Sequence, residues 1–352
     1  MRIAHVNQDR GIAAHKKKGA WVHVDALRRA FLSLGTDVCA LDIPDESELT
    51  DALARAHRAA PIGLVYERHA LGAFAAGEFT RARGIPHVLE VNAPLALEEE
   101  LYRRGPSAVE PRERELFAGV QRVLAVSAEV ARYVTERGAR AECVHVCPNA
   151  VDPVQFRPRE PNDALRNELV PDGRFALGFH GRLRAWHNFP LLIDAVCLLI
   201  DQRVPVHLLV LGEGAFEEHL HDRVPADRVR LLGWQSHDEA ARVVACFDAI
   251  ALTYAADRPF YYSPLKLLEA MAVRAVPVVP RISTLPDAVG DGQRGLVYTA
   301  GDPSALAAAL RSLAEQPALH ERLATNARAY AEQHSWRRIA QDIVEFAAMV
   351  RA

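Results

Sequence analysis

Short apolar runs alternate with amphipathic segments almost from one end of the chain to the other, and this alternation restricts the fold more than any other feature. In the first half, the runs that predict strands are 3–6, 37–41, 62–66, 87–91, 123–126 and 141–146. Segments with helical periodicity lie between them, at 22–33, 71–83 and 128–137. Strands that alternate with helices form a parallel sheet with helices on both faces. Ligands of such sheets bind beyond the carboxyl ends of the strands.

The alternation stops once, in a stretch rich in Pro, Asn and Asp at 147–161, and then resumes. The second series predicts strands at 175–179, 206–211, 229–232, 249–253, 276–279 and 295–297, and helices at 190–200, 238–246, 264–272 and 303–315. Because 352 residues exceed the usual size of one hydrophobic core, we expect two α/β domains. We predict doubly wound, Rossmann-like domains over 1–157 and 158–334, and a C-terminal helix, 335–352, that returns to the first domain.

Charge and cysteine content narrow the class of protein. The formal net charge of −3 argues against a nucleic-acid partner. The five cysteines lie within apolar runs, at Cys39, Cys143, Cys147, Cys197 and Cys246. Buried, reduced thiols are typical of a cytoplasmic protein, and we expect no secretory leader and no membrane span. A peripheral contact of the lysines at 16–18 with anionic lipid stays open, as does the oligomeric state.

Five short motifs follow one another from residue 148 onward. They are Pro148-Asn149-Ala150-Val151-Asp152, Gly181-Arg182-Leu183, Leu211-Gly212-Glu213-Gly214, Ser263-Pro264-Leu265-Lys266 and Glu269-Ala270-Met271-Ala272. Their order and spacing resemble those of glycosyltransferase family 4, most strongly over residues 148–303. The resemblance implies a GT-B fold, in which two Rossmann-like domains face each other across a cleft. It also implies transfer of a sugar, with retention of configuration, from a nucleotide-diphosphate sugar to an acceptor.

The residues themselves predict an anion site in the second domain. Ser263 is a good N-cap and Pro264 a good first residue for a helix whose free N–H groups attract an anion. Lys266 adds a positive charge in the same turn. Arg182 follows a predicted strand, and its guanidinium can bind phosphate bidentately. These residues fit the diphosphate of a nucleotide sugar.

The resemblance adds further residues to the donor site, namely Gly19, Gly181, His187, Gly212, Tyr261, Leu265 and Glu269. By this resemblance, Glu269 accepts hydrogen bonds from the ribose hydroxyls of the donor. The residues alone favour a second interpretation, in which Glu269 lies on a helix surface and pairs with Lys266 three residues earlier.

Two positions depart from the family pattern. Tyr261 stands where the family usually has a glutamate that contacts the transferred sugar, and tyrosine offers a hydrogen bond without a charge near neutral pH. His187 stands where the family usually has a lysine. A histidine is partly protonated near neutral pH, so we expect its attraction for phosphate to depend on pH.

Three clusters at strand ends of the first domain are candidates for the acceptor side. Lys18 and Gly19 open a helix after the first strand and resemble the family loop over the ligands, with a solvated charge run as the alternative. Glu67 and Arg68 lie just past the third predicted strand, with a salt-bridged loop as the alternative. Glu90 and Asn92 share one face at the end of the fourth strand, where either could orient an acceptor; a strand-end turn capped by Asn92 is equally open.

Stabilising the leaving diphosphate is the central chemical requirement of the implied reaction. We assign catalysis to Arg182 and Lys266, together with Glu90 and Asn92 on the acceptor side. No Asp-x-Asp pair is present to hold a metal on a diphosphate, so we expect no metal and no cofactor beyond the nucleotide-sugar co-substrate. Two alternatives stay open: a GT-B epimerase of nucleotide sugars and a nucleotide-sugar-binding relative without activity. The acceptor is not identified by the sequence.

Overall fold

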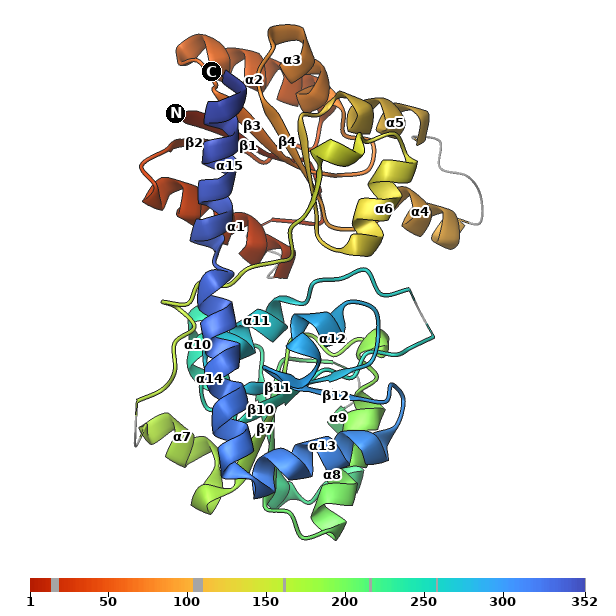
Figure 1. Ribbon diagram of the computed structural model, residues 1–352, viewed down its shortest axis with the longest axis vertical. Helices are drawn as coiled ribbons and strands as arrows, with labels where there is room; N and C mark the ends of the chain where they lie inside the picture. The colour runs from red at the N-terminus through yellow and green to blue at the C-terminus, as the bar shows by residue number, and fades with distance from the viewer. Residues whose placement is uncertain (14–18, 104–109, 161–162, 215–216, 258, 352) are drawn as a thin grey trace. The chain divides into compact units, whose positions relative to one another are not determined.

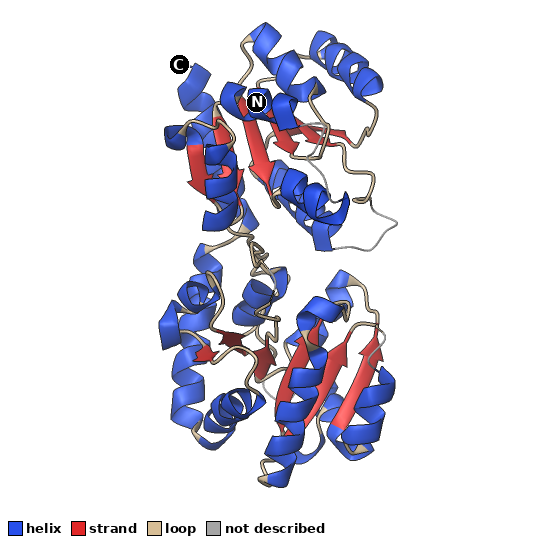
Figure 2. Ribbon diagram, turned by 90° about the vertical axis from the view of Figure 1, so that its right-hand side faces the viewer, coloured by secondary structure: helices blue, strands red, loops and turns tan. Residues whose placement is uncertain are grey.

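The computed structural model describes residues 1–13, 19–103, 110–160, 163–214, 217–257 and 259–351. The chain forms two compact units. The first unit comprises Met1–Asn149, Tyr261–Ser263 and Trp336–Ala352, and the second comprises Ala150–Phe260 and Pro264–Ser335. Figure 1 follows the chain through both units, and Figure 2 shows that helices cover the strands of each sheet.

The first unit is built on a six-stranded sheet whose strands are all parallel. Its strands are β1 (Arg2–Asn7), β2 (Asp37–Leu41), β3 (Leu64–Arg68), β4 (His87–Val91), β5 (Arg122–Ala125) and β6 (Val144–Val146). Its helices are α1 (Gly19–Ser33), α2 (Glu46–Ala59), α3 (Ala75–Arg83), α4 (Leu95–Arg103), α5 (Glu110–Gly119), α6 (Ala128–Glu136) and α15 (Trp336–Arg351). The spatial order β2-β1-β3-β4-β5-β6 reverses direction between β1 and β3, which makes this point a topological switch point.

The second unit repeats this architecture with the Rossmann strand order. Its strands are β7 (Phe175–His180), β8 (Val206–Leu211), β9 (Val229–Gly233), β10 (Ala249–Ala251), β11 (Val276–Pro280) and β12 (Leu296–Tyr298). Its helices are α7 (Ala164–Leu169), α8 (Phe189–Asp201), α9 (Glu217–Arg223), α10 (His237–Val244), α11 (Leu265–Ala272), α12 (Leu285–Ala288), α13 (Pro303–Glu315) and α14 (Pro317–Gln333). The order β12-β11-β10-β7-β8-β9 places the switch point between β7 and β10. The predicted pair of doubly wound sheets is confirmed.

Hydrophobic clusters cover both faces of the second sheet. Ala176 and Leu209 belong to one cluster, whereas their chain neighbours Leu177 and Leu208 belong to another. Successive side chains of a strand point to opposite faces, so these near-continuous apolar runs are the expected pattern of a sheet that is buried twice.

Most predicted elements lie within a few residues of the observed ones, and the exceptions have local causes. The third strand starts at Leu64 instead of residue 62, and Ala141–Cys143 form a 3₁₀ turn before β6. Helix α2 was not predicted, although Asp45 caps it by accepting a hydrogen bond from the Glu48 N–H. Helix α14 was not predicted either, although Pro317 stands in its first turn.

The C-terminal helix α15 belongs to the first unit, as predicted. It packs against α1; in Figure 1, α15 is blue and α1 is red. The Trp336 ring at the start of α15 lies 4.4 Å from the His23 ring on α1. Arg337 donates hydrogen bonds to the carbonyl and the hydroxyl of Ser33 at the end of α1. The contact therefore combines ring packing with hydrogen bonds from the first turn of α15.

We predict that Gly178→Ala destabilises the second unit. A Cβ at Gly178, inside β7, would lie 1.9 Å from a ring carbon of the buried Phe247, and a packed core does not yield that space. We expect a loss of roughly 1–3 kcal/mol in the free energy of unfolding, measured by urea denaturation. Gly119→Ala is the matched control, because its added Cβ would have no atom within 4 Å from the described residues beyond its own helix. Equal stability of the two variants would contradict the tight packing at β7.

Candidate functional site

Two glycines bring the ends of β7 and β8 into contact at the switch point of the second unit. Gly181 has φ +115° and Gly212 has φ +141°, conformations that side chains disfavour. The Gly181 N–H donates a 2.8 Å hydrogen bond to the carbonyl of Leu211. A Cβ at Gly212 would lie 2.1 Å from the carbonyl oxygen of Gly181. Glycine is therefore required for this close approach.

The Lys266 ammonium lies against these turns. A Cβ at Gly181 would lie 3.1 Å from the Lys266 Nζ, which itself lies 4.9 Å from the centre of the Phe179 ring and 3.4 Å from the His187 Nε2. Burial lowers the pKa of Lys266 to about 8. A cation held in this way is a strong attractor for an anion, because it is incompletely solvated before the anion arrives.

His187 does not carry the charge that the sequence analysis expected. Its pKa is lowered to about 3, first by burial and then by the Lys266 ammonium, so its ring is neutral near pH 7. Its Nδ1 accepts a 3.3 Å hydrogen bond from the Arg184 N–H, and its ring lies 5.7 Å from the Phe179 ring. The predicted pH-dependent attraction for phosphate near neutrality is therefore wrong. The ring packs beside the cation instead of adding to it.

Helix α11 starts one residue later than predicted. Its N-cap is Pro264, in an extended conformation, and its first residue is Leu265. The predicted N-cap, Ser263, belongs to the first unit. The Ser263 hydroxyl accepts a 2.9 Å hydrogen bond from the Asn149 N–H, and its carbonyl accepts one from the Asn149 side chain. The N-cap assignment of Ser263 is thus wrong, because Asn149 occupies its polar groups.

Glu269 is buried inside the second unit. Only 4% of the residue is exposed, and its two oxygens each lie 3.0 Å from a histidine Nε2, on His180 and His237. These hydrogen bonds and the nearby Lys266 keep the pKa of Glu269 below its ordinary value in spite of burial. The alternative of an exposed helix pair with Lys266 is wrong, because Glu269 is buried and both of its oxygens are hydrogen-bonded to histidines.

The remaining donor-site candidates lie in different surroundings. Arg182 is exposed directly after Gly181, beyond the end of β7. Tyr261 belongs to the first unit, where its phenol contacts the carboxylate of Glu98 on α4. Gly19 is the first residue of α1, and Lys18 lies outside the described residues.

On β4, one strand away from the switch point of the first unit, Glu90 is held by two basic side chains. Its oxygens lie 2.5 Å from the His23 Nε2 and 3.1 Å from an Arg68 nitrogen. These partners lower the pKa of Glu90 to about 2 although burial alone would raise it. Asn92 follows the end of β4 and is partly exposed. A carboxylate with so low a pKa serves as a fixed acceptor of hydrogen bonds and is a poor general base.

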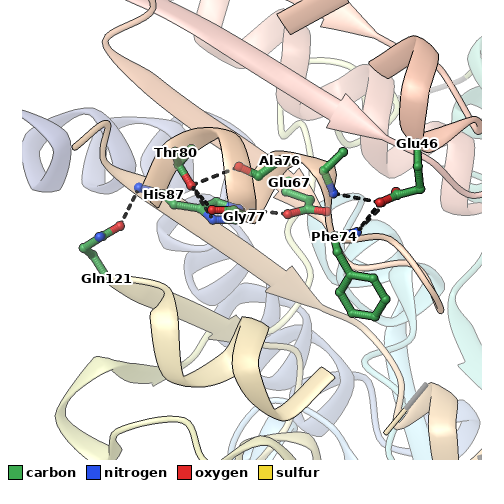
Figure 3. Close-up of polar contacts among 9 residues, drawn as sticks. Glu46, Glu67, Phe74, Ala76, Gly77, Thr80, His87 and Gln121 are labelled. Carbon is green, nitrogen blue, oxygen red and sulfur yellow. Dashed lines mark hydrogen bonds and ion pairs between the residues drawn. The ribbon is translucent and has the colours of Figure 1, made fainter. Parts of the chain in front are cut away.

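The structure does not bring Glu67 together with Arg68 and Glu90. Glu67 is fully buried, and its carboxylate lies 2.9 Å from the His87 Nε2 (Figure 3). The other ring nitrogen of His87 lies 3.4 Å from the Thr80 hydroxyl of α3. Adjacent residues of a strand point to opposite faces, which separates Glu67 from Arg68.

Sequence reasoning missed the histidines that fix the carboxylates of Glu90 and Glu269: His23, His180 and His237. The sequence around each of these histidines gives little indication of a site, because none of them stands in one of the five motifs. One stronger signal was available. Lys266 is the only lysine outside the run 16–18, although Lys and Arg together number 42. Lysine and arginine are not interchangeable, because the lysine ammonium is a compact point charge, so a lone lysine in an arginine-rich domain marks a candidate site residue.

Three further observations bear on the chemistry of the chain. Within the described ranges, no group of three or more His, Cys, Asp or Glu side chains could hold a metal ion. The helices described here are all too short or too polar to cross a membrane. All five cysteines are free.

Family comparisons agree with this geometry. The description "Glycosyl transferase 4-like domain" matches residues 23–150, and "Glycosyl transferases group 1" matches residues 174–316. The two matches cover most of both units. The chain belongs to glycosyltransferase family 4. The second matched region of this glycosyltransferase contains the glycine turns, Lys266 and Glu269.

Bacterial relatives give the same assignment, and a solved structure gives the same fold. The glycosyltransferase is 28% identical to the D-inositol 3-phosphate glycosyltransferase of Stackebrandtia nassauensis over 86% of this chain and 72% of the relative. It is 30% identical to the enzyme of the same name from Actinosynnema mirum, over 74% of this chain and 66% of the relative. The structure of Anabaena HepE in complex with UDP and glucose superposes with a TM-score of 0.73 at 21% identity, over 99% of this chain and 100% of HepE. That structural likeness shows the GT-B fold.

We predict that Lys266→Met stabilises the ligand-free protein at pH 7. The pKa of Lys266 is about 8 in the folded chain, whereas that of an exposed lysine is near 10.5. The protonated ammonium therefore lowers the stability of the folded protein by its full amount below pH 8, and this loss disappears as the pH rises towards 10.5. Methionine removes this cost, with an expected gain of roughly 1 kcal/mol or more at pH 7. Melting temperatures at pH 7 and pH 10 measure it, and the gain should shrink at the higher pH. Lys266→Arg, which keeps a charge, is the control; a lower melting temperature for Lys266→Met at pH 7 would contradict the prediction.

Proposed function

We propose that this glycosyltransferase transfers a sugar from a nucleotide-diphosphate sugar to an acceptor, with retention at the anomeric carbon and without a metal ion. The observation that carries the proposal is the half-buried Lys266 side chain, whose ammonium lies beside the Gly181 and Gly212 turns at the switch point of the second unit. Doubly wound sheets bind their ligands at this point. The UDP and glucose in the HepE complex support a UDP-sugar as the first donor to test.

The donor chemistry follows from charge placement. As the bond between the sugar and the diphosphate breaks, negative charge develops on the leaving group, and fixed cations stabilise it. Lys266 and the N-terminus of α11 supply this stabilisation from one turn of the chain. Arg182, exposed beside Gly181, adds a planar guanidinium that can bind two phosphate oxygens. A cation set of this kind takes the place of a divalent metal.

We assign the acceptor to the first unit. Glu90, fixed by His23 and Arg68, and the neighbouring Asn92 present polar groups at the carboxyl end of β4. The low pKa of Glu90 supports a role in orienting an acceptor hydroxyl and argues against proton abstraction by this carboxylate. We therefore assign the acceptor proton to the leaving phosphate. The free cysteines support a reducing, cytoplasmic location for the reaction.

We predict that one nucleotide stands out in a panel of UDP-, GDP-, ADP- and dTDP-sugars. A ligand at one hundred times its dissociation constant should stabilise the protein by about 2.7 kcal/mol, which a thermal melt detects. Arg182→Ala should lose most of this shift and most of the transferase activity. Arg322→Ala, another exposed arginine of the second unit, is the matched control and should behave as wild type. If no nucleotide shifts the melting temperature of the folded protein, the donor assignment is wrong.

We predict that donor turnover does not depend on a divalent metal. The positive charges that face the diphosphate are those of the chain itself, so EDTA should leave the rate of donor cleavage unchanged. Release of the nucleoside diphosphate measures this rate, first after EDTA treatment and then after Mg²⁺ or Mn²⁺ is added. A rate that falls with EDTA and recovers with Mn²⁺ would rule out the metal-free proposal.

A further inference from the structure

Two polar side chains end the strands on either side of the switch point of the first unit. Asn7 is the last residue of β1, and Arg68 is the last residue of β3. The two residues are partners in the parallel register, so their side chains point to the same face of the sheet. Neighbouring strands lie about 4.8 Å apart. Because β1 and β3 are adjacent in the sheet (Figure 1), this pair lies where a doubly wound sheet binds its ligand.

Asn7 presents a fixed hydrogen-bond acceptor. Its Nδ2 donates a 3.1 Å hydrogen bond to the Ile12 carbonyl and a 3.2 Å hydrogen bond to the Asp42 Oδ1. Both partners can only accept, so the amide N–H₂ faces them and the Oδ1 is left over. Only 2% of Asn7 is exposed, and its Oδ1 has no hydrogen-bond partner among the described residues. A buried carbonyl oxygen of this kind needs a donor from water or from a ligand.

Arg68 presents donors that the protein does not use. Its Nη1 donates a 3.1 Å hydrogen bond to the Glu90 Oε2. Within the part of the chain that the structure describes, this is the one hydrogen bond of a guanidinium that carries five N–H groups. Since 11% of the Arg68 side chain is exposed, the remaining N–H groups can donate to a ligand.

Glu90 fixes the direction of the Arg68 guanidinium. Burial raises the pKa of Glu90, but three polar neighbours outweigh burial and lower it to about 2. These neighbours are His23, Arg68 and Asn92. The His23 ring is in turn packed 4.4 Å from the Trp336 ring at the start of α15. The carboxylate is thus held by donors of the protein, and it orients the acceptor through Arg68.

We propose that Asn7 and Arg68 form the acceptor subsite of this glycosyltransferase, and that its acceptor is a neutral polyhydroxyl compound, such as a sugar or a sugar alcohol. The inference rests on the proposed function and deepens it by naming the class of acceptor. A hydroxyl group both donates and accepts, so two hydroxyls of one molecule can donate to the Asn7 Oδ1 and accept from Arg68. A phosphate or carboxylate group only accepts, so it would pair with Arg68 and leave the Asn7 Oδ1 unpaired.

The charges around this pair also favour a neutral acceptor. Two carboxylates flank it, with Asp42 beside Asn7 and Glu90 beside Arg68. An Arg28 nitrogen lies 2.7 Å from the Asp42 Oδ1, and Arg68 balances Glu90. Because the positive charges are already matched, an anion would gain little from Arg68 and would be repelled by both carboxylates.

The test uses the full chain with the donor that the nucleotide panel identifies, and it measures release of the nucleoside diphosphate. Neutral acceptors are glucose, mannitol and myo-inositol, and their charged counterparts are gluconate and the phosphate monoesters of the three polyols. At least one neutral polyol should accelerate release roughly tenfold more than its charged counterpart does, because the counterpart leaves a buried acceptor unpaired. A faster release with the charged compounds would overturn the inference. The same holds if no neutral polyol accelerates release although the donor still raises the melting temperature.

Variants of Arg68 test the subsite itself. Arg68→Met removes the donors at nearly constant length and should raise the KM for the polyol roughly tenfold, while the affinity for the nucleotide stays unchanged. Arg68→Lys keeps a charge and a donor, so its KM should lie between those of wild type and Arg68→Met. Arg58→Met, at an exposed arginine of the same unit, is the matched control and should behave as wild type.

Deoxy analogues of the polyol separate binding from a merely structural role. An analogue that lacks the hydroxyl held by Arg68 but still accepts the sugar should react about tenfold less efficiently than the polyol with wild type, and equally well with Arg68→Met. Melting temperatures of the variants show that each is folded. An unchanged KM in Arg68→Met, or a discrimination against every deoxy analogue that Arg68→Met retains, would overturn the assignment of Arg68. If no nucleotide sugar binds, the proposed function fails and the inference fails with it.

Discussion

Parallel strands are buried on both faces of a sheet, so each connection must run as a crossover on one face, usually a helix. At the point where the strand order reverses, the connections that follow two adjacent strands run to opposite sides. The carboxyl ends of these two strands therefore stay uncovered. In the second unit this happens between β7 and β10, and in the first unit between β1 and β3. The site residues discussed above depend on this constraint, because the uncovered strand ends are where polar side chains and glycine turns can face a ligand.

The second unit concentrates positive charge at that position at some cost to its own stability. Lys266 is held partly out of water, beside a neutral His187 and an aromatic ring, and its pKa is lowered as a result. Burying a cation without a partner is unfavourable, and an arriving diphosphate supplies the partner. The same physical cause makes His187 neutral, which explains how the chain tolerates a histidine where its family usually has a lysine.

One carboxylate in each unit is held by two basic side chains. Glu90 is held by His23 and Arg68, and Glu269 by His180 and His237. In both cases the basic partners outweigh burial and keep the pKa of the carboxyl low. Such carboxylates orient hydroxyl groups of ligands, whereas proton transfer would need a higher pKa. The pattern fits a reaction whose acceptor proton leaves with the phosphate.

The sequence by itself determined the two parallel sheets, the return of the C-terminal helix and the family, because these depend on periodicity and on motifs within short segments. It also located Lys266 and the glycine turns, since their spacing follows the strands. Only the tertiary structure decided that Glu269 is buried between two histidines, that Ser263 is bound by Asn149, and that Glu67 pairs with His87 on the opposite face from Arg68. Each of these outcomes joins segments that are distant in the sequence or depends on which face a side chain takes. Charge state and hydrogen-bond partners are set by such neighbours, and a local pattern of residues does not specify them.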